Sequence, residues 1–61
     1  MTTSAILHDP TDNTCETIKD ITPDVNINSH EDCLVLIWNR LLTPNEKEQL
    51  TCLGIEFFRE Y

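Results

Sequence analysis

The chain has only 61 residues, and its eleven acidic side chains outnumber four basic ones, for a net charge of −7. A chain of this length forms one domain, residues 1–61, with little room for an enclosed ligand site of about 300–1,000 Å³, so an enzyme acting alone is not expected. Four scattered basic side chains exclude direct binding to nucleic acid, and the longest apolar run, Cys33–Trp38, is far shorter than the about 20 residues that span a membrane.

The first third of the chain combines a short apolar run with a helix signal. Ser4–Leu7 is a candidate edge strand. Residues 9–12 place a capping acid before a first-turn proline, with a second acid at the third position, which predicts a helix over 10–21. Thr22 precedes a proline and therefore disfavours the α region, so the helix should end there.

Two strands are predicted in the middle of the chain. Residues 24–28 alternate polar and apolar, as a half-buried strand does, and residues 33–38 form a continuous apolar run typical of a central strand. Residues 29–32 would then be a hairpin loop. Because Ser29 and Asp32 also match a capping box, a helix over 30–42 is an open alternative that periodicity does not exclude.

The last third contains a helix with both ends marked. Residues 43–46 form a capping box with proline at the first helical position. Gly54 suits the left-handed conformation that ends a helix. We therefore predict a helix over 44–53 and a strand over 55–60, whereas the alternative continues the helix through Gly54 to the end of the chain.

These segments together predict a small α+β domain with the order β-α-β-β-α-β. An antiparallel sheet would carry two short helices on one face. If the helical alternative for residues 30–42 holds, the domain is a three-helix bundle instead.

The negative charge is concentrated in the first half of the chain. Residues 1–32 hold seven acids against Lys19, a net of −6, whereas residues 33–61 hold four acids against three basic residues, a net of −1. Three acids of the first predicted helix stand at i, i+4 and i+8, so they would form a row with steps of about 6 Å. Such a row can imitate the phosphates that basic grooves bind; the alternative is an acidic surface that only keeps the protein in solution. The candidate partner-binding residues are Asp9, Asp12, Glu16, Asp20, Asp24, Glu31 and Asp32.

Residues capable of other chemistry are not arranged for it. Cys15, Cys33 and Cys52 are separated by 17 and 18 residues, which fits neither a disulfide framework nor a zinc motif, so we expect reduced, buried thiols. His8 and His30 have acidic neighbours in sequence, but adjacent residues rarely face each other. No catalytic residue, metal site or cofactor is predicted.

In size, charge and lack of a site motif, the whole chain resembles the small acidic anti-CRISPR proteins encoded by phages, in particular inhibitors of type I-C systems. That family shares no diagnostic motif, so no functional residue carries over from it. The resemblance implies a DNA mimic that binds the basic DNA-binding surface of a CRISPR surveillance complex (Cascade) in the bacterial cytoplasm. We expect the protein to be a monomer and to have no membrane partner.

Two other classes of function stay open. One is an inhibitor of a restriction enzyme or of a transcription factor. The other is an interaction adaptor that binds through exposed apolar residues around Trp38 or Phe58. Because Phe57 and Phe58 alternate along a strand, one of them should face outward, which would supply such an anchor.

Overall fold

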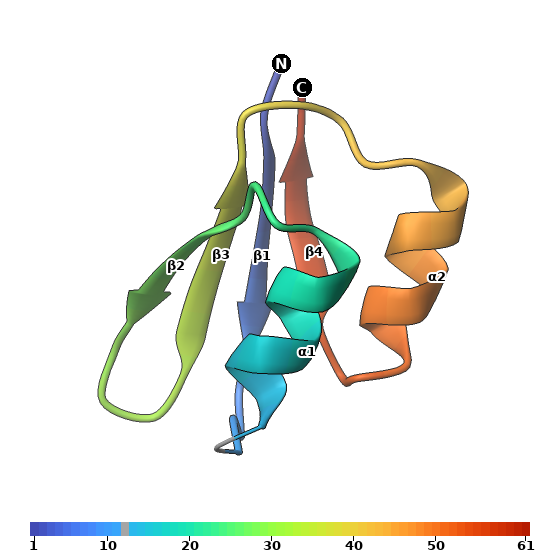
Figure 1. Cartoon of the computed structure of the whole chain (residues 1–61). Coiled ribbons are helices and arrows are strands. Elements are labelled where there is room, and N and C mark those ends of the chain that lie inside the picture. Colours follow the sequence, from blue (N-terminus) through green and yellow to red (C-terminus); the bar gives the residue numbers. More distant parts are fainter. Residues whose placement is uncertain (12) are drawn as a thin grey trace.

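The computed structural model describes residues 1–11 and 13–61. Figure 1 shows four strands and two helices in the predicted β-α-β-β-α-β order. The α+β prediction is therefore confirmed, and the three-helix bundle is wrong. The elements are β1 (Thr3–Leu7), α1 (Thr14–Ile21), β2 (Asn26–Ser29), β3 (Leu34–Trp38), α2 (Pro44–Thr51) and β4 (Glu56–Glu60).

The strands form one sheet in the order β2-β3-β1-β4, and every neighbouring pair is antiparallel. This is the split β-α-β, or ferredoxin-like, arrangement. β3 is a central strand, as its apolar run predicted. The prediction of an edge strand at Ser4–Leu7 is wrong, because β1 lies between β3 and β4. Its polar start is compatible with burial because the hydroxyl of Thr3 donates to the carbonyl of Arg40 at 2.8 Å.

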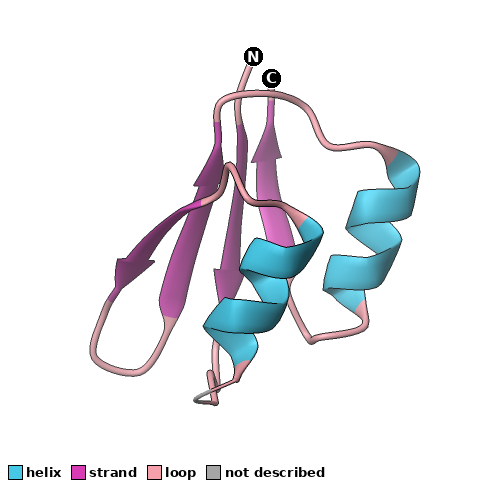
Figure 2. Cartoon of the chain, in the orientation of Figure 1, coloured by secondary structure: helices cyan, strands magenta, loops and turns pink. Residues whose placement is uncertain are grey.

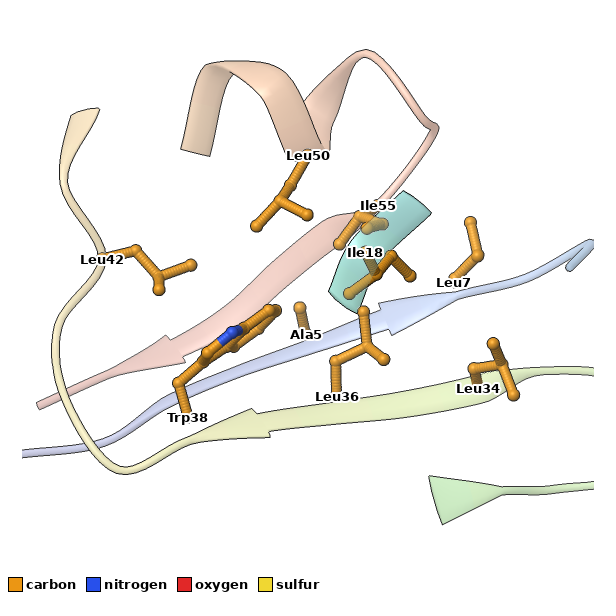
Figure 3. Packing of buried hydrophobic residues seen from close by; sticks show 9 residues of the cluster. All are labelled: Ala5, Leu7, Ile18, Leu34, Leu36, Trp38, Leu42, Leu50 and Ile55. Carbon is orange, nitrogen blue, oxygen red and sulfur yellow. The ribbon is translucent and has the colours of Figure 1, made fainter. Parts of the chain in front are cut away.

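Both helices lie on the same face of the sheet (Figure 2). The side chains that alternate toward them from β1 and β3 are buried, and they pack with side chains from both helices and from the loops beside α2 (Figure 3). Trp38 and Leu50 are fully buried at the centre of this layer. The core consists of Ala5, Leu7, Ile18, Leu34, Leu36, Trp38, Leu42, Leu50 and Ile55.

Helix α1 starts later than predicted. Its first residue is Thr14, and its N-cap is Asn13, which makes no side-chain capping bond. The predicted cap at Asp9 is wrong because Thr11 and the first helical residue, Thr14, bond to each other: the N–H of Thr11 donates to the Thr14 hydroxyl at 3.0 Å, and the N–H of Thr14 donates to the Thr11 carbonyl at 3.0 Å. Hydroxyls near the backbone compete with a helix in this way.

Helix α2 starts as predicted. The N–H of Glu46 donates to the Thr43 hydroxyl at 3.2 Å, and the N–H of Thr43 donates to the Glu46 carboxylate at 3.0 Å, which completes the capping box. The helix ends at Thr51, two residues early, and Gly54 has the expected positive φ, +90°. Its N–H donates to the Thr51 carbonyl at 2.9 Å, and β4 follows, so the alternative of a continued helix is wrong.

The two edges of the sheet are β2 and β4. A bulge in the pairing of β1 with β4 places Phe57 opposite Ala5 and Arg59 opposite Ser4, so Phe58 is the extra residue. The Phe57 ring packs 6.1 Å from the Trp38 ring, measured between centroids, whereas Phe58 is 59 % exposed. The prediction that one of these two aromatics faces outward is confirmed.

The two ends of the described chain are neighbours. Thr2 and Tyr61 exchange backbone hydrogen bonds, one in each direction, so the pairing of β1 with β4 continues to the last residue. Figure 1 shows both ends at the same edge of the molecule, away from the loop that precedes α1.

Candidate interaction surface

The fold gathers four of the seven candidate acids at one end of the molecule. β1 ends, β2 ends and α1 begins at the same end of the sheet, opposite the chain termini (Figure 1). Asp9 follows β1, Glu16 lies in the first turn of α1, and Glu31 and Asp32 lie in the hairpin loop between β2 and β3. All four are exposed, and we call them the acidic end.

The other three candidates are placed differently. Asp20 is exposed on α1 one turn after Glu16, toward the opposite end of that helix. Asp24 lies in the loop between α1 and β2, at the end that holds the chain termini. Asp12 lies outside the described residues. The i, i+4 pair of the predicted row, Glu16 and Asp20, therefore exists on α1, whereas the other described candidate acids are divided between the two ends of the molecule.

Arg40 holds Asp24 in an ion-pair network that the sequence did not predict. Its guanidinium donates to the Asp24 carboxylate at 2.7 and 3.2 Å and to the Glu46 carboxylate with two bonds of 2.8 Å. Hydrogen bonds from Arg40 lower the pKa of Asp24, and the same arginine together with the Thr43 N–H lowers the pKa of Glu46 to about 2. Such bidentate pairs are strong and directional, and here they neutralise acids far from the acidic end.

Two of the other three Lys and Arg side chains also lie away from the acidic end. Lys47 forms an ion pair with Glu60 at the end of β4. Arg59 lies with its guanidinium 5.6 Å from the centre of the Tyr61 ring, and Lys19 belongs to the last turn of α1. The chain has four Lys and Arg residues in total, and Lys19, three residues after Glu16 on α1, is the one that lies close to the acidic end.

The position of helix α1 stabilises negative charge at the acidic end. The N-terminus of α1 lies there, and the positive end of a helix dipole stabilises an acid in the first turn, here Glu16. His8 approaches Glu56 at 3.6 Å beside the same loop. Glu56 is a further exposed acid in this region that sequence reasoning missed, because it belongs to the C-terminal half and only the antiparallel pairing of β4 with β1 brings it there.

The apolar alternative depends on which aromatics are exposed. Trp38 is fully buried, and its indole N–H donates to the Thr22 hydroxyl at 2.9 Å, so Trp38 itself does not supply an exposed apolar contact. The large apolar side chains on the surface of the described residues are Met1, Leu41, Phe58 and Tyr61. These residues are the candidates for an apolar contact.

The cysteines are free thiols, as expected. Cys15 and Cys33 are half-buried, but Cys52 is exposed, so the expectation of buried thiols is wrong for Cys52, which follows the last turn of α2. Among residues 1–11 and 13–61, no group of His, Cys, Asp or Glu is placed to hold a metal ion. No pocket opens on this described surface, and no described helix is both long and apolar enough to cross a membrane.

Comparison with protein-family models, with curated proteins and with solved structures found no match to this chain. The fold itself hosts many unrelated functions. Any functional conclusion therefore depends on the surface of this chain.

Proposed function

We propose that this protein is a non-enzymatic inhibitor that binds the basic DNA-binding surface of a bacterial defence complex, acting as an acidic DNA mimic. The observation that carries the proposal is the separation of charge. Four exposed acids lie at one end, while three of the four Lys and Arg side chains contact residues elsewhere and only Lys19 lies beside one of the four acids.

Electrostatics explains why such an end would find a basic groove. Charges of one sign on a small surface attract the opposite sign over a Debye length of about 8–10 Å at physiological salt, and complementary charge increases association rates. Glu31 and Asp32 project on a hairpin loop beyond the strands (Figure 1), and Glu16 lies on the neighbouring helix. A surface that binds phosphates with Lys and Arg would accept these carboxylates in their place.

The resemblance in size and charge to small anti-CRISPR proteins names the partner class. The target would be a CRISPR surveillance complex in the bacterial cytoplasm, and the protein would exclude target DNA from it. An inhibitor of another DNA-binding protein, such as a restriction enzyme or a transcription factor, would use the same acidic end and would differ only in its target.

The test is DNA-binding competition on a purified type I-C surveillance complex with two matched double variants. The first, Glu31→Lys with Asp32→Lys, reverses one Glu and one Asp at the acidic end. The second, Glu48→Lys with Glu60→Lys, reverses two exposed acids on α2 and β4 that are not candidate partner-binding residues. Both variants change the net charge equally, and circular dichroism should first show that each is folded.

The measured quantity is the protein concentration that displaces half of the bound DNA. We expect the first double variant to raise this concentration at least about tenfold more than the second does, because a reversed charge at an interface costs a few kcal/mol. Equal losses would show that only the net charge matters and that the acidic end is not the contact. If neither variant loses competition, the mimic proposal is wrong. An apolar contact through Phe58 and Tyr61, which are 59 % and 71 % exposed, would then be the function to test.

A further inference from the structure

The face of the sheet opposite the helices is covered by none of the described elements (Figure 1). Residues that pair directly across antiparallel strands lie on the same face, so the register defines two adjacent rows on this side. The first row is Asn28, Val35, Ile6 and Glu56, and the second is Asn26, Ile37, Ser4 and Arg59. We call these eight residues the open face.

The open face has an apolar centre and a charged margin. Ile6, Val35 and Ile37 come from the two central strands and are only half-buried. Glu56 and Arg59 stand on β4 at one margin, one in each row. Aromatic residues and arginine are the side chains that most often anchor protein interfaces, and Arg59 lies beside the 71 % exposed ring of Tyr61.

The two rows are complementary to each other under a two-fold rotation. An axis that lies in the contact plane, perpendicular to the strands, exchanges the first row of one copy with the second row of the other. Glu56 of each copy then meets Arg59 of the other, and Val35 meets Ile37. An isologous contact of this kind repeats every favourable pair twice.

We propose that the open face binds a second copy of this chain, so that two sheets pack face to face with the helices outside. The charge pairing of Glu56 with Arg59 across the contact selects a second copy over an unrelated partner. This proposal replaces the expectation of a monomer. It does not depend on the proposed function, since the acidic end belongs to the loops and to α1 and stays uncovered in such a dimer.

The size of the face limits the strength of the dimer. Four strands about 4.8 Å apart and five residues of about 3.4 Å each give a face of roughly 19 by 17 Å. A contact of roughly 320 Å² per copy, or about 650 Å² in total, is smaller than the about 1,200–2,000 Å² that stable specific interfaces bury and belongs with weak, transient contacts. Each copy also carries a net charge of −7, which opposes association. We therefore expect a weak dimer that dissociates on dilution and is best measured at about 0.15 M salt, where the Debye length is about 8 Å.

Sedimentation equilibrium over a dilution series tests the proposal with the wild-type chain and three single variants. Arg59→Glu and Glu56→Arg each place like charges opposite each other, so each should raise the dimer dissociation constant at least about tenfold. Mixing the two variants restores both opposite-charge pairs, so a heterodimer should form at close to the wild-type strength. Glu48→Arg changes an exposed acid on α2 and is the matched control that should not change dimerisation.

Three results would overturn the proposal. The first is a wild-type protein that stays monomeric at millimolar concentration. The second is a dimer that Arg59→Glu and Glu56→Arg weaken no more than Glu48→Arg does. The third is weakening by both variants without recovery in the mixture, since this would show that the two residues do not face each other. Far-UV circular dichroism of each variant separates loss of the dimer from loss of the fold, and the wild-type dilution series needs no variant at all.

Discussion

The hydrogen bond between Trp38 and Thr22 gives a prediction whose size follows from the structure. Both side chains are fully buried, and the indole N–H donates to the Thr22 hydroxyl at 2.9 Å. In Thr22→Val a methyl group of similar shape replaces the hydroxyl, so the indole N–H loses its acceptor without a cavity forming. A buried donor left without a partner costs about 1–3 kcal/mol. The other hydrogen bond of the Thr22 hydroxyl adds little to this cost.

The Thr22 hydroxyl also donates to the Ile18 carbonyl at 3.1 Å, but that carbonyl accepts the Thr22 backbone N–H at 2.8 Å as well, so it stays satisfied in the variant. For a chain of this length the whole free energy of unfolding is roughly 3–9 kcal/mol. The substitution should therefore remove a large fraction of the stability. Thr22→Ser keeps the hydroxyl and should cost only about 1 kcal/mol for the lost methyl group.

Urea unfolding followed by far-UV circular dichroism measures these differences. Trp38→Phe removes the donor, so Thr22→Val should cost clearly less in that background than in the wild type. The double-mutant cycle should give a coupling energy of about 1–2 kcal/mol. A coupling energy below about 0.5 kcal/mol would refute the reasoning, because the cost of Thr22→Val would then not come from the indole.

Three further predictions concern charge and turn chemistry. The pKa of Glu46 falls from its ordinary value of 4.5 to about 2 in the fold, so its contribution is present above about pH 4.5 and is lost as the pH falls toward 2; Glu46→Gln should flatten the acid unfolding curve in this window, by at most about 3 kcal/mol and less after solvent screening, and an unchanged curve would contradict the Arg40 network. In thermal unfolding, Gly54→Ala should cost about 1–2 kcal/mol of stability through its backbone conformation, because φ is +90°. The added Cβ would lie 3.9 Å from Leu7 Cδ1, which is an ordinary contact and adds no clash. Gly54→Asn should cost less in the same measurement, and equal costs would point to another cause. Added salt should raise the melting temperature by screening the acidic end, and a fall between low and moderate salt would show that the helix caps and the ion pairs dominate.

The sequence was sufficient where the structural signals are local. The capping box at Thr43 and the glycine stop at Gly54 depend on neighbours within a few residues, and both were predicted correctly. The start of α1 was missed although its signals are also local, because two sets of signals compete there. The acid and proline at Asp9 and Pro10 indicate a cap, whereas the Thr11 and Thr14 hydroxyls form a turn that delays the helix.

Tertiary contacts explain the other differences. Arg40 reaches Asp24 across 16 positions and Glu46 across six, and nothing in the local sequence marks it as the residue that would neutralise Asp24. The division of the candidate acids between two ends follows from chain reversals at Thr22–Val25 and in the hairpin loop, which a linear charge count does not show. Similarly, Glu56 reaches the loop after β1 only because β4 pairs with β1.

The backbone pairing of Thr2 with Tyr61 has a practical consequence for the molecule in use. Both termini leave from one edge, at the end opposite the acidic loops. A fluorophore, an affinity tag or a solid support attached through either terminus therefore presents the same far surface to the solution. Attachment through residue 1 or through residue 61 therefore gives the same orientation, and a linker of a few residues would suffice to join these two positions into a cyclic chain.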